Sequence, residues 1–129
     1  MRDTAGTTRG EIAPDGRWAT VCALADLTPD RGVCALVGGD AVAVFLTSGD
    51  DTVRAIGNHD PFGDASVLSR GLVGWTDVDG DAVPYVASPL RKQRFDLRTG
   101  LALNGAEAAA GSYPVRIRDG WVEVAASLG

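Results

Sequence analysis

The chain contains a single histidine, His59, which lies beside an acidic residue in the stretch NHDPF at residues 58–62. Imidazole and carboxylate groups bind metals and act as general bases, and Asp64 and Ser88 offer further oxygen donors. Neighbouring side chains in extended backbone point to opposite sides, so His59 and Asp60 are not expected to bind one ion. We therefore interpret His59 as a surface residue that makes hydrogen bonds.

Motifs of nucleophilic, zinc-dependent and phosphate-transfer catalysis do not occur in the sequence, which has no G-x-S-x-G, H-E-x-x-H or G-x-x-x-x-G-K. The stretch DVDGD at residues 77–81 resembles a calcium-binding loop, but its glycine is misplaced and the later bidentate glutamate is missing. A hairpin turn explains these aspartates better. The chain on its own is therefore predicted not to be a catalyst.

The composition is acidic, with a net charge of −5 over 129 residues and an isoelectric point of about 4.6. Nucleic acids and anionic membranes attract basic surfaces, so both are excluded as partners. No apolar run approaches the roughly 20 residues that cross a bilayer. The N-terminus lacks the apolar segment of a secretory signal. These features predict a cytoplasmic protein.

Both cysteines lie in apolar, strand-like segments outside any C-x-x-C motif. Cys22 belongs to ATVCAL and Cys34 to GVCALV. Structural disulfides are rare in a reducing cytosol, so the sequence favours two buried thiols. A disulfide or a redox pair is the alternative.

Short runs of valine, alanine, leucine and aromatic residues alternate with turn sequences along the chain. The strands predicted on this basis are residues 18–23, 32–37, 41–46, 52–56, 72–77, 82–87, 94–96, 115–118 and 121–124. Asp-Gly pairs at 79–80 and 119–120 predict tight hairpins, because glycine tolerates the positive φ of a type I′ turn. The alanine-rich residues 106–110 are long enough for only one helical turn.

Strands at this spacing predict an all-β fold, an antiparallel β-sandwich or barrel. Residues 17–129 are predicted to form one domain, and the polar residues 1–16 a flexible N-terminal extension. Two segments interrupt the strand pattern: loop one, residues 57–70, and loop two, residues 88–93. Protruding loops on a rigid β scaffold usually carry function, so we expect the functional site there.

The two loops resemble those that hold the cluster in Rieske ferredoxin domains, Cys-Pro-His and Cys-Pro-x-His-Gly. The segments DPF at 60–62 and SPLRKQRFDLRTG at 88–100 keep the prolines, the Phe-Asp and the Thr-Gly in register. The positions that correspond to the cluster ligands are Asp60, Phe62, Ser88 and Arg91. A Rieske centre needs two thiolates and two imidazoles, and this chain has one histidine and no cysteine in either loop. The resemblance therefore implies a Rieske-like domain with no cluster, metal or other cofactor of its own.

We hypothesise that the two loops still meet and that the cluster position is repacked. Phe62 would bury its ring there, which stabilises the fold by about 1.5–3 kcal/mol when burial is complete. Asp60 and Arg91 would either form an ion pair between the loops or both face solvent.

Loop two and its flanks are basic within an otherwise acidic protein. This charge is either a solvated run or a docking patch for an acidic surface of a partner. The candidate docking residues are Arg70, Arg91, Lys92, Arg94 and Arg98.

Longer stretches resemble one Rieske-like family more closely than the ferredoxins. These stretches are DLTPDRGVCALVGGDAVAVF (26–45), NHDPFGDASVLSRGLVG (58–74), ASPLRKQRFDLRTG (87–100) and YPVRIRDGWVEV (113–124). They are similar to the small subunits of cytoplasmic, assimilatory NAD(P)H-dependent nitrite reductases. In that family the Asp-Pro-Phe and Ser-Pro-Leu loops without cluster ligands are themselves the pattern.

This resemblance implies a non-catalytic subunit of an oxidoreductase, which binds and stabilises a large subunit. The large subunit is implied to carry FAD, a 4Fe-4S cluster and siroheme, and to reduce nitrite to ammonium with NAD(P)H during nitrate assimilation. Two alternatives stay open. One is a Rieske-type electron-transfer ferredoxin with unusual ligation, and the other is a free-standing β-domain that binds a different partner or a small ligand.

Overall fold

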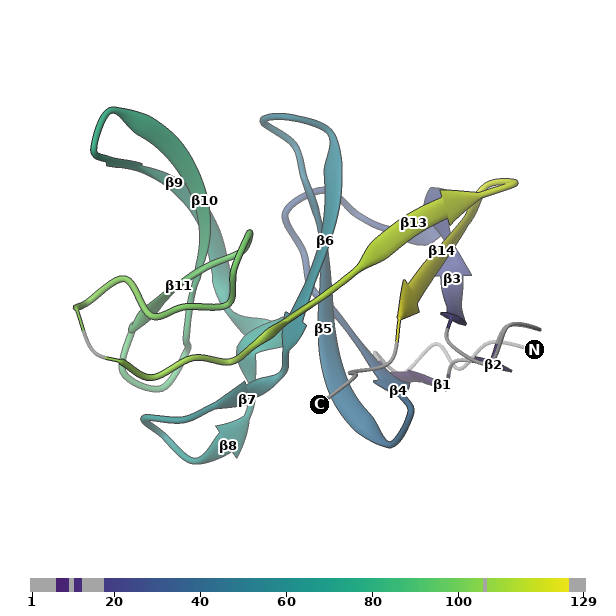
Figure 1. Cartoon of the computed structure of the whole chain (residues 1–129), viewed down its shortest axis with the longest axis horizontal. Coiled ribbons are helices and arrows are strands. Elements are labelled where there is room, and N and C mark those ends of the chain that lie inside the picture. The colour runs from purple at the N-terminus through teal and green to yellow at the C-terminus, as the bar shows by residue number, and fades with distance from the viewer. Residues whose placement is uncertain (1–6, 10, 13–17, 106, 126–129) are drawn as a thin grey trace.

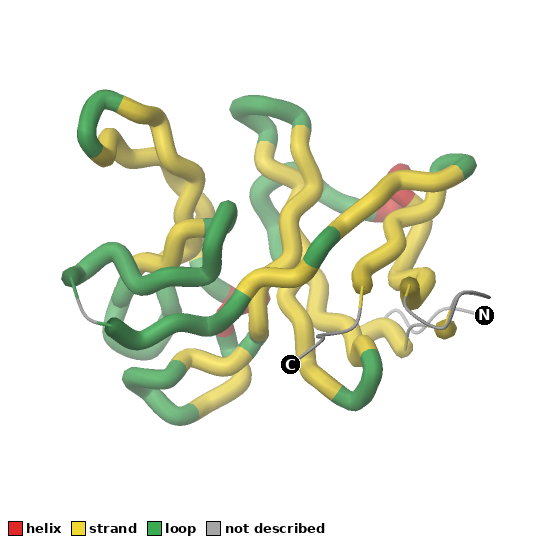
Figure 2. The backbone as a smooth tube through the Cα atoms, in the orientation of Figure 1, coloured by secondary structure: helices red, strands yellow, loops and turns green. Residues whose placement is uncertain are grey.

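The structure is a computed structural model that describes residues 7–9, 11–12, 18–105 and 107–125. Strands dominate it, and the only helical segments in the part described are the single 3-10 turns η1 (Leu24–Asp26) and η2 (Leu68–Arg70). Figures 1 and 2 show the strands crossing one another in several layers, with the β9–β10 hairpin standing apart at the left. The prediction of an all-β fold is confirmed. No helix in the described ranges is long and apolar enough to span a membrane.

The two largest sheets in the described part have five and four strands. The first has the order β1-β4-β5-β6-β12 and the second β13-β14-β3-β2. The first consists of β1 (Thr7–Arg9), β4 (Val33–Val37), β5 (Asp40–Thr47), β6 (Thr52–Gly57) and β12 (Ser112–Tyr113). The second consists of β2 (Glu11–Ile12), β3 (Trp18–Ala23), β13 (Val115–Arg118) and β14 (Trp121–Ala125).

A third sheet, in the order β11-β10-β9, positions the two loops. Its strands are β9 (Leu72–Val78), β10 (Asp81–Ala87) and β11 (Arg94–Asp96). Loop two connects β10 to β11, and loop one leads from β6 to β9. Loop one contains a small hairpin of its own, made by β7 (His59–Asp60) and β8 (Ala65–Ser66).

Two hydrophobic cores meet at β5, which is buried on both faces. Val42 and Val44 pack with the second sheet, whereas Ala43 and Phe45 pack toward the third. Successive side chains of a strand point to opposite faces, so a strand between two cores must be apolar throughout. This explains why β5 reads as a continuous run, AVAVFL, with no polar alternation.

All nine predicted strands are present, with ends within one residue of the prediction. Both Asp-Gly turns have the expected backbone, with φ of 52° and 88° at Asp79 and Gly80, and 52° and 80° at Asp119 and Gly120. The helical turn predicted for residues 106–110 is wrong for the described residues 107–110. There the Ala110 N–H donates to the Gly100 carbonyl over 2.8 Å, and the backbone follows an extended path.

Only part of the predicted N-terminal extension lies within the described residues. β1 pairs with β4 in parallel, and β2 pairs with β3 in an antiparallel arrangement. Residues 1–6, 10 and 13–16 lie outside the described ranges, so the flexibility of the segment stays a prediction.

Gly100, the glycine of the Thr-Gly pair, is expected to be intolerant of a side chain. Its φ is +76°, and a Cβ would lie 2.4 Å from the Gly111 carbonyl oxygen. Gly100→Ala therefore combines backbone strain with a clash and should cost about 2 kcal/mol of unfolding free energy. Gly80→Ala is the matched control, because Gly80 has φ +88° with nothing near its Cβ position. Urea denaturation should show a loss of only about 1 kcal/mol for that control. Equal losses would contradict the close approach at Gly100.

Asp50, in the turn between β5 and β6, is expected to titrate at unusually low pH. Its pKa falls from 3.8 to about 2, mainly because the Arg54 guanidinium hydrogen-bonds the carboxylate, with a smaller contribution from Thr47. A depressed folded pKa means that the stabilisation is complete above the ordinary pKa and is lost as the pH falls through about 2. Arg54→Ala should raise the Asp50 midpoint in an NMR titration, whereas Arg118→Ala should not. An unchanged midpoint in Arg54→Ala would refute this assignment.

Candidate functional site

Asp60 joins the two loops, and it does so from a fully buried position. Its Oδ2 accepts a hydrogen bond of 2.5 Å from the Ser88 hydroxyl, so the two positions that correspond to cysteine ligands are bonded directly to each other. Its Oδ1 accepts from the backbone N–H groups of Phe62 and Gly63, at 2.8 and 3.3 Å. Both Asp60 and Ser88 are at most 1% exposed. The hypothesis that the loops meet is confirmed by this contact.

Ser88 also makes three hydrogen bonds within loop two. Its Oγ accepts the N–H of Leu90 at 3.2 Å, and its carbonyl accepts the N–H of Lys92 at 3.0 Å. Its own N–H donates to the carbonyl of Gln93 over 2.8 Å. Lys92 has a φ of +59°, which lets the chain reverse within six residues. Loop two is therefore a tight turn with a fixed shape.

Phe62 packs against the core beside the loops, but it is only half-buried, so the burial of its ring is less than the repacking hypothesis expects. Its ring packs against Phe95, with the ring centroids 5.9 Å apart and the planes tilted by 46°. Leu90 from loop two contacts loop one at Gly63, where a Cβ would lie 2.4 Å from the leucine Cδ1. Apolar contacts thus fill the space between the loops beside the Asp60–Ser88 hydrogen bond.

Neither arrangement predicted for Asp60 and Arg91 is correct: the two side chains form no ion pair, and only Arg91 faces solvent. Asp60 is buried and receives its hydrogen bonds from Ser88 and two backbone amides, whereas Arg91 is exposed. A buried carboxylate needs donors that are themselves buried, and the short serine side chain supplies one without bringing a second charge inside.

Asn58 is a structural residue of loop one that the sequence did not single out. It is 3% exposed, and its Oδ1 accepts the N–H of Ser69 at 2.7 Å. Its Nδ2 donates to the sulfur of Cys34 over 3.4 Å, which ties the loop to β4. An asparagine next to a glycine looks like an ordinary turn residue, so only the structure reveals this burial. The other cysteine, Cys22, lies in the core, whereas Cys34 is partly exposed.

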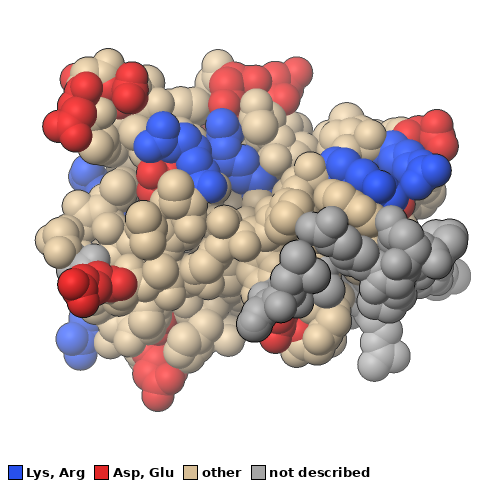
Figure 3. Space-filling view, viewed as in Figure 1, with Lys and Arg blue, Asp and Glu red and all other residues tan. Residues whose placement is uncertain are grey.

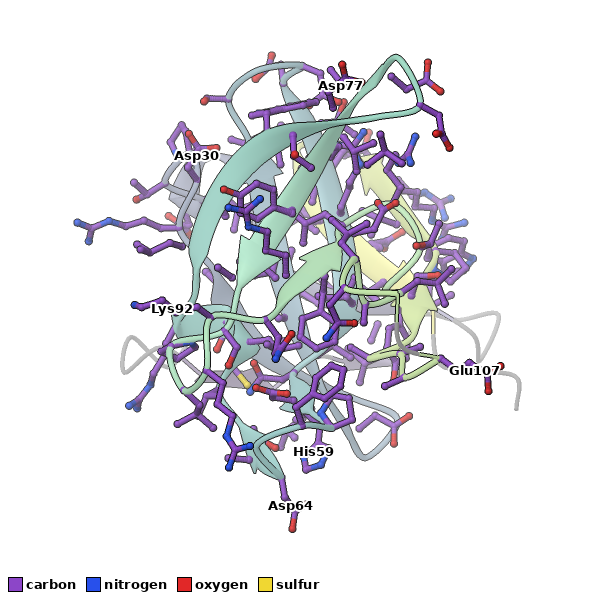
Figure 4. The ribbon with its side chains drawn as sticks, turned by 90° about the vertical axis from the view of Figure 1, so that its left-hand side faces the viewer. Asp30, His59, Asp64, Asp77, Lys92 and Glu107 are labelled. Atoms are coloured by element: carbon purple, nitrogen blue, oxygen red, sulfur yellow. The ribbon has the colours of Figure 1, made fainter. Side chains whose placement is uncertain are left out.

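His59 and Asp60 point apart, as expected for neighbours in a strand. His59 is exposed, and its Nε2 lies 3.2 Å from the Asp64 carboxylate. Figure 4 shows His59 and Asp64 together at one end of the molecule, Asp77 at the opposite end, and Lys92 between them at the left edge.

The five candidate docking cations fall into two groups. Arg98 donates to the Asp96 carboxylate over 3.1 and 3.0 Å, and this carboxylate raises the pKa of Arg98. Arg94 lies over the ring of Tyr85, 4.6 Å from its centroid. Arg70, Arg91 and Lys92 are exposed and form no ion pair with another described residue. The structure therefore assigns local partners to two of the five.

The four ligand positions do not fit a Rieske cluster. The Asp60 Oδ2 and Ser88 Oγ atoms are 2.5 Å apart, which leaves no space for iron between them. Phe62 has no lone pair to donate, and Arg91 carries a positive charge and faces solvent. Among the described residues no group of three histidine, cysteine, aspartate or glutamate side chains is placed to hold a metal ion.

A groove of about 530 Å³ lies away from the loops, between β6, the segment after β11 and the β12–β13 region. Arg54 and Arg98 line it, together with the Tyr113 side chain and apolar residues. Each arginine is bound to a carboxylate, Asp50 for the first and Asp96 for the second. Their charge is thus largely compensated within the chain.

Comparison with known proteins first defines the class of the chain. The family of the Rieske-like 2Fe-2S domain matches residues 17–125. A crystal structure described as an NADH-dependent nitrite reductase small subunit from Mycobacterium tuberculosis superposes with a TM-score of 0.77 at 40% identity. The match covers 87% of this chain and 96% of that one.

The relatives narrow this class further. The nitrite reductase (NADH) small subunit of Salmonella typhimurium is 44% identical over 108 residues, which cover 84% of this chain and 96% of that protein. This chain belongs to the family of nitrite reductase small subunits, Rieske-like components of an oxidoreductase. The predicted family membership is confirmed. The nitrite reductase [NAD(P)H] large subunit of Klebsiella oxytoca also matches, at 38% identity over 117 residues, 90% of this chain and 12% of that protein.

Proposed function

We propose that this chain is the cofactor-free small subunit of a cytoplasmic NAD(P)H-dependent nitrite reductase, and that it acts by binding and stabilising the large subunit. The match to the Klebsiella oxytoca large subunit carries this proposal, because there a domain similar to this chain is part of the large polypeptide itself. Where the same domain is a separate chain, a non-covalent interface has to replace the covalent link.

The geometry of the loops supports action by contact. The cysteine-equivalent positions are bonded to each other, and the histidine-equivalent positions hold a phenylalanine and an arginine. None of these side chains offers the thiolate or imidazole ligands of a Rieske centre. What the loops do provide is a fixed shape at the end of the third sheet, which suits recognition of another protein.

The large subunit is proposed to carry FAD, a 4Fe-4S cluster and siroheme, and to pass electrons from NAD(P)H to nitrite, yielding ammonium for nitrate assimilation. In this arrangement the small subunit holds no electron carrier. Its contribution is the stability or the assembly of its partner.

The test is to express the large subunit of the same organism with and without this chain. We expect the two chains to elute together in size-exclusion chromatography, and the large subunit to unfold at a higher temperature in the complex. The isolated chain should contain no stoichiometric iron or acid-labile sulfide. Stoichiometric iron and sulfide with visible absorbance would favour the ferredoxin alternative. Separate elution would favour a free-standing β-domain with a different partner.

A further inference from the structure

Three cations at the loop end lack the local compensation found at several other basic side chains. Arg54, Arg98 and Arg116 are each bound to a carboxylate. By contrast, Arg70, Arg91 and Lys92 are exposed and make no ion pair within the described part of the chain. Asp64, beside His59, is the exposed carboxylate of loop one. The loop end is therefore locally basic on a protein of net charge −5.

Two large apolar side chains are exposed among these cations. Leu72 is 75% exposed and Leu90 is 48% exposed. Leu72 lies opposite Ala87 in the β9–β10 pairing, directly before loop two begins, so it flanks the same end. Exposed leucines beside basic residues are characteristic of protein interfaces, whose centres are apolar and whose rims are charged.

This surface is held in a fixed shape before any partner arrives. The buried Asp60–Ser88 hydrogen bond joins the loops, and Leu90 packs against Gly63 across them. Gly71, between Arg70 and Leu72, comes so near the Ala87 carbonyl that a Cβ would lie 2.4 Å from its oxygen. A preorganised surface loses little conformational entropy on binding.

Acidic side chains also gather on two turns away from loop one. Figure 3 shows them at the top, over the β9–β10 and β5–β6 turns, with basic side chains directly below them and further acidic side chains at the bottom of this face. The exposed aspartates of these turns are Asp50, Asp51, Asp77, Asp79 and Asp81. These turns are at the end opposite to β7 and β8 of loop one (Figure 1). An acidic partner surface would be attracted by Arg70, Arg91 and Lys92 and repelled by the aspartates of these two turns, which favours docking through the loop end.

We propose that Arg70, Leu72, Leu90, Arg91 and Lys92 form a docking surface, and that its occupant is an apolar patch of the large subunit bordered by aspartate or glutamate side chains. This inference rests on the proposed function. It also revises the docking residues expected from the sequence, since Arg94 and Arg98 are replaced by the two leucines.

The experiment measures the affinity of the full-length chain for the purified large subunit by biolayer interferometry, at low and high salt. Arg91→Glu is compared with Arg118→Glu, which makes the same charge change on the β13–β14 hairpin. Leu72→Ser is compared with Ile117→Ser, because Ile117 is also exposed, at 45%. Urea denaturation of each variant confirms that it is folded.

We expect Arg91→Glu to weaken binding about tenfold at low salt and less at high salt, because salt screens exposed charges. Leu72→Ser should weaken binding about tenfold at both salt concentrations. Both control variants should bind within about twofold of the unmodified chain. If the unmodified chain binds and the controls lose as much affinity as the loop-end variants, this surface is wrong and the proposed function stands. If the unmodified chain does not bind, both are wrong.

Discussion

Replacing Asp60 with alanine is expected to lower the free energy of unfolding by about 3 kcal/mol, because the buried carboxylate accepts hydrogen bonds from three donors at once. Those donors are the Ser88 hydroxyl and the backbone N–H groups of Phe62 and Gly63. All three would lose their acceptor, and the Ser88 hydroxyl would lose it in a buried position. The loss should appear as a lower midpoint in urea denaturation.

Asp64→Ala is the matched control, since Asp64 is on the same loop with its side chain 94% exposed. That substitution should cost no more than about 1 kcal/mol, which is the strain of an alanine at the φ of 53° that Asp64 adopts. Asp60→Asn should be intermediate, because the amide oxygen still accepts a backbone N–H whereas the negative charge is lost. If Asp60→Ala and Asp64→Ala proved equally mild, Asp60 would not be the residue that holds the loops together.

The strands could be predicted from the sequence because their signals are local. Apolar runs on either side of the two Asp-Gly turns predict β9 and β10, and β13 and β14, without any knowledge of tertiary contacts. The same local rule gives both hairpin turns, where aspartate and glycine adopt positive φ. The helical turn predicted for the alanine-rich segment is wrong, because the Ala110 N–H bonds to the Gly100 carbonyl and not within a helical turn.

The partner of Asp60 could not be predicted, because it depends on burial. From charge alone, Arg91 is the natural partner of an aspartate on the facing loop. The tight turn of loop two instead directs Ser88 inward and leaves Arg91 in solvent. Because Ser88 stands 28 residues away from Asp60, no local pattern connects them.

The candidate site could be located from the residue types at four positions in the sequence. Which side chains form its exposed surface could be seen only in the structure. The lack of two imidazoles follows from the sequence itself, since His59 is the one histidine. The exposure of Leu72 and Leu90 does not follow from the sequence, because both lie in segments typical of an ordinary strand or loop. The pairing of Arg98 with Asp96, two residues away, has a local signal that a charge-pair search would have found.

Replacing Phe95 with alanine is expected to be the most destabilising of these substitutions, at about 3–5 kcal/mol. Phe95 is fully buried in the core that joins the third sheet to β5 and β6. It pairs with Val86 in the β10–β11 ladder, and its ring supports Phe62 from loop one. Removal of the ring would leave a cavity among side chains of β5, β6, η2 and β10, which would have to move to close it.

Phe62→Ala is the control that separates a core role from a loop role, because Phe62 contacts the same cluster but is half-buried. It should cost about 1–2 kcal/mol, since part of the ring is already in water. Comparable losses for the two phenylalanines in urea denaturation would mean that the loops depend on Phe62 as strongly as on Phe95. The expected difference of about 2 kcal/mol would instead show that Phe95, of the Phe-Asp pair, supports the loops, and that Phe62 only covers its ring.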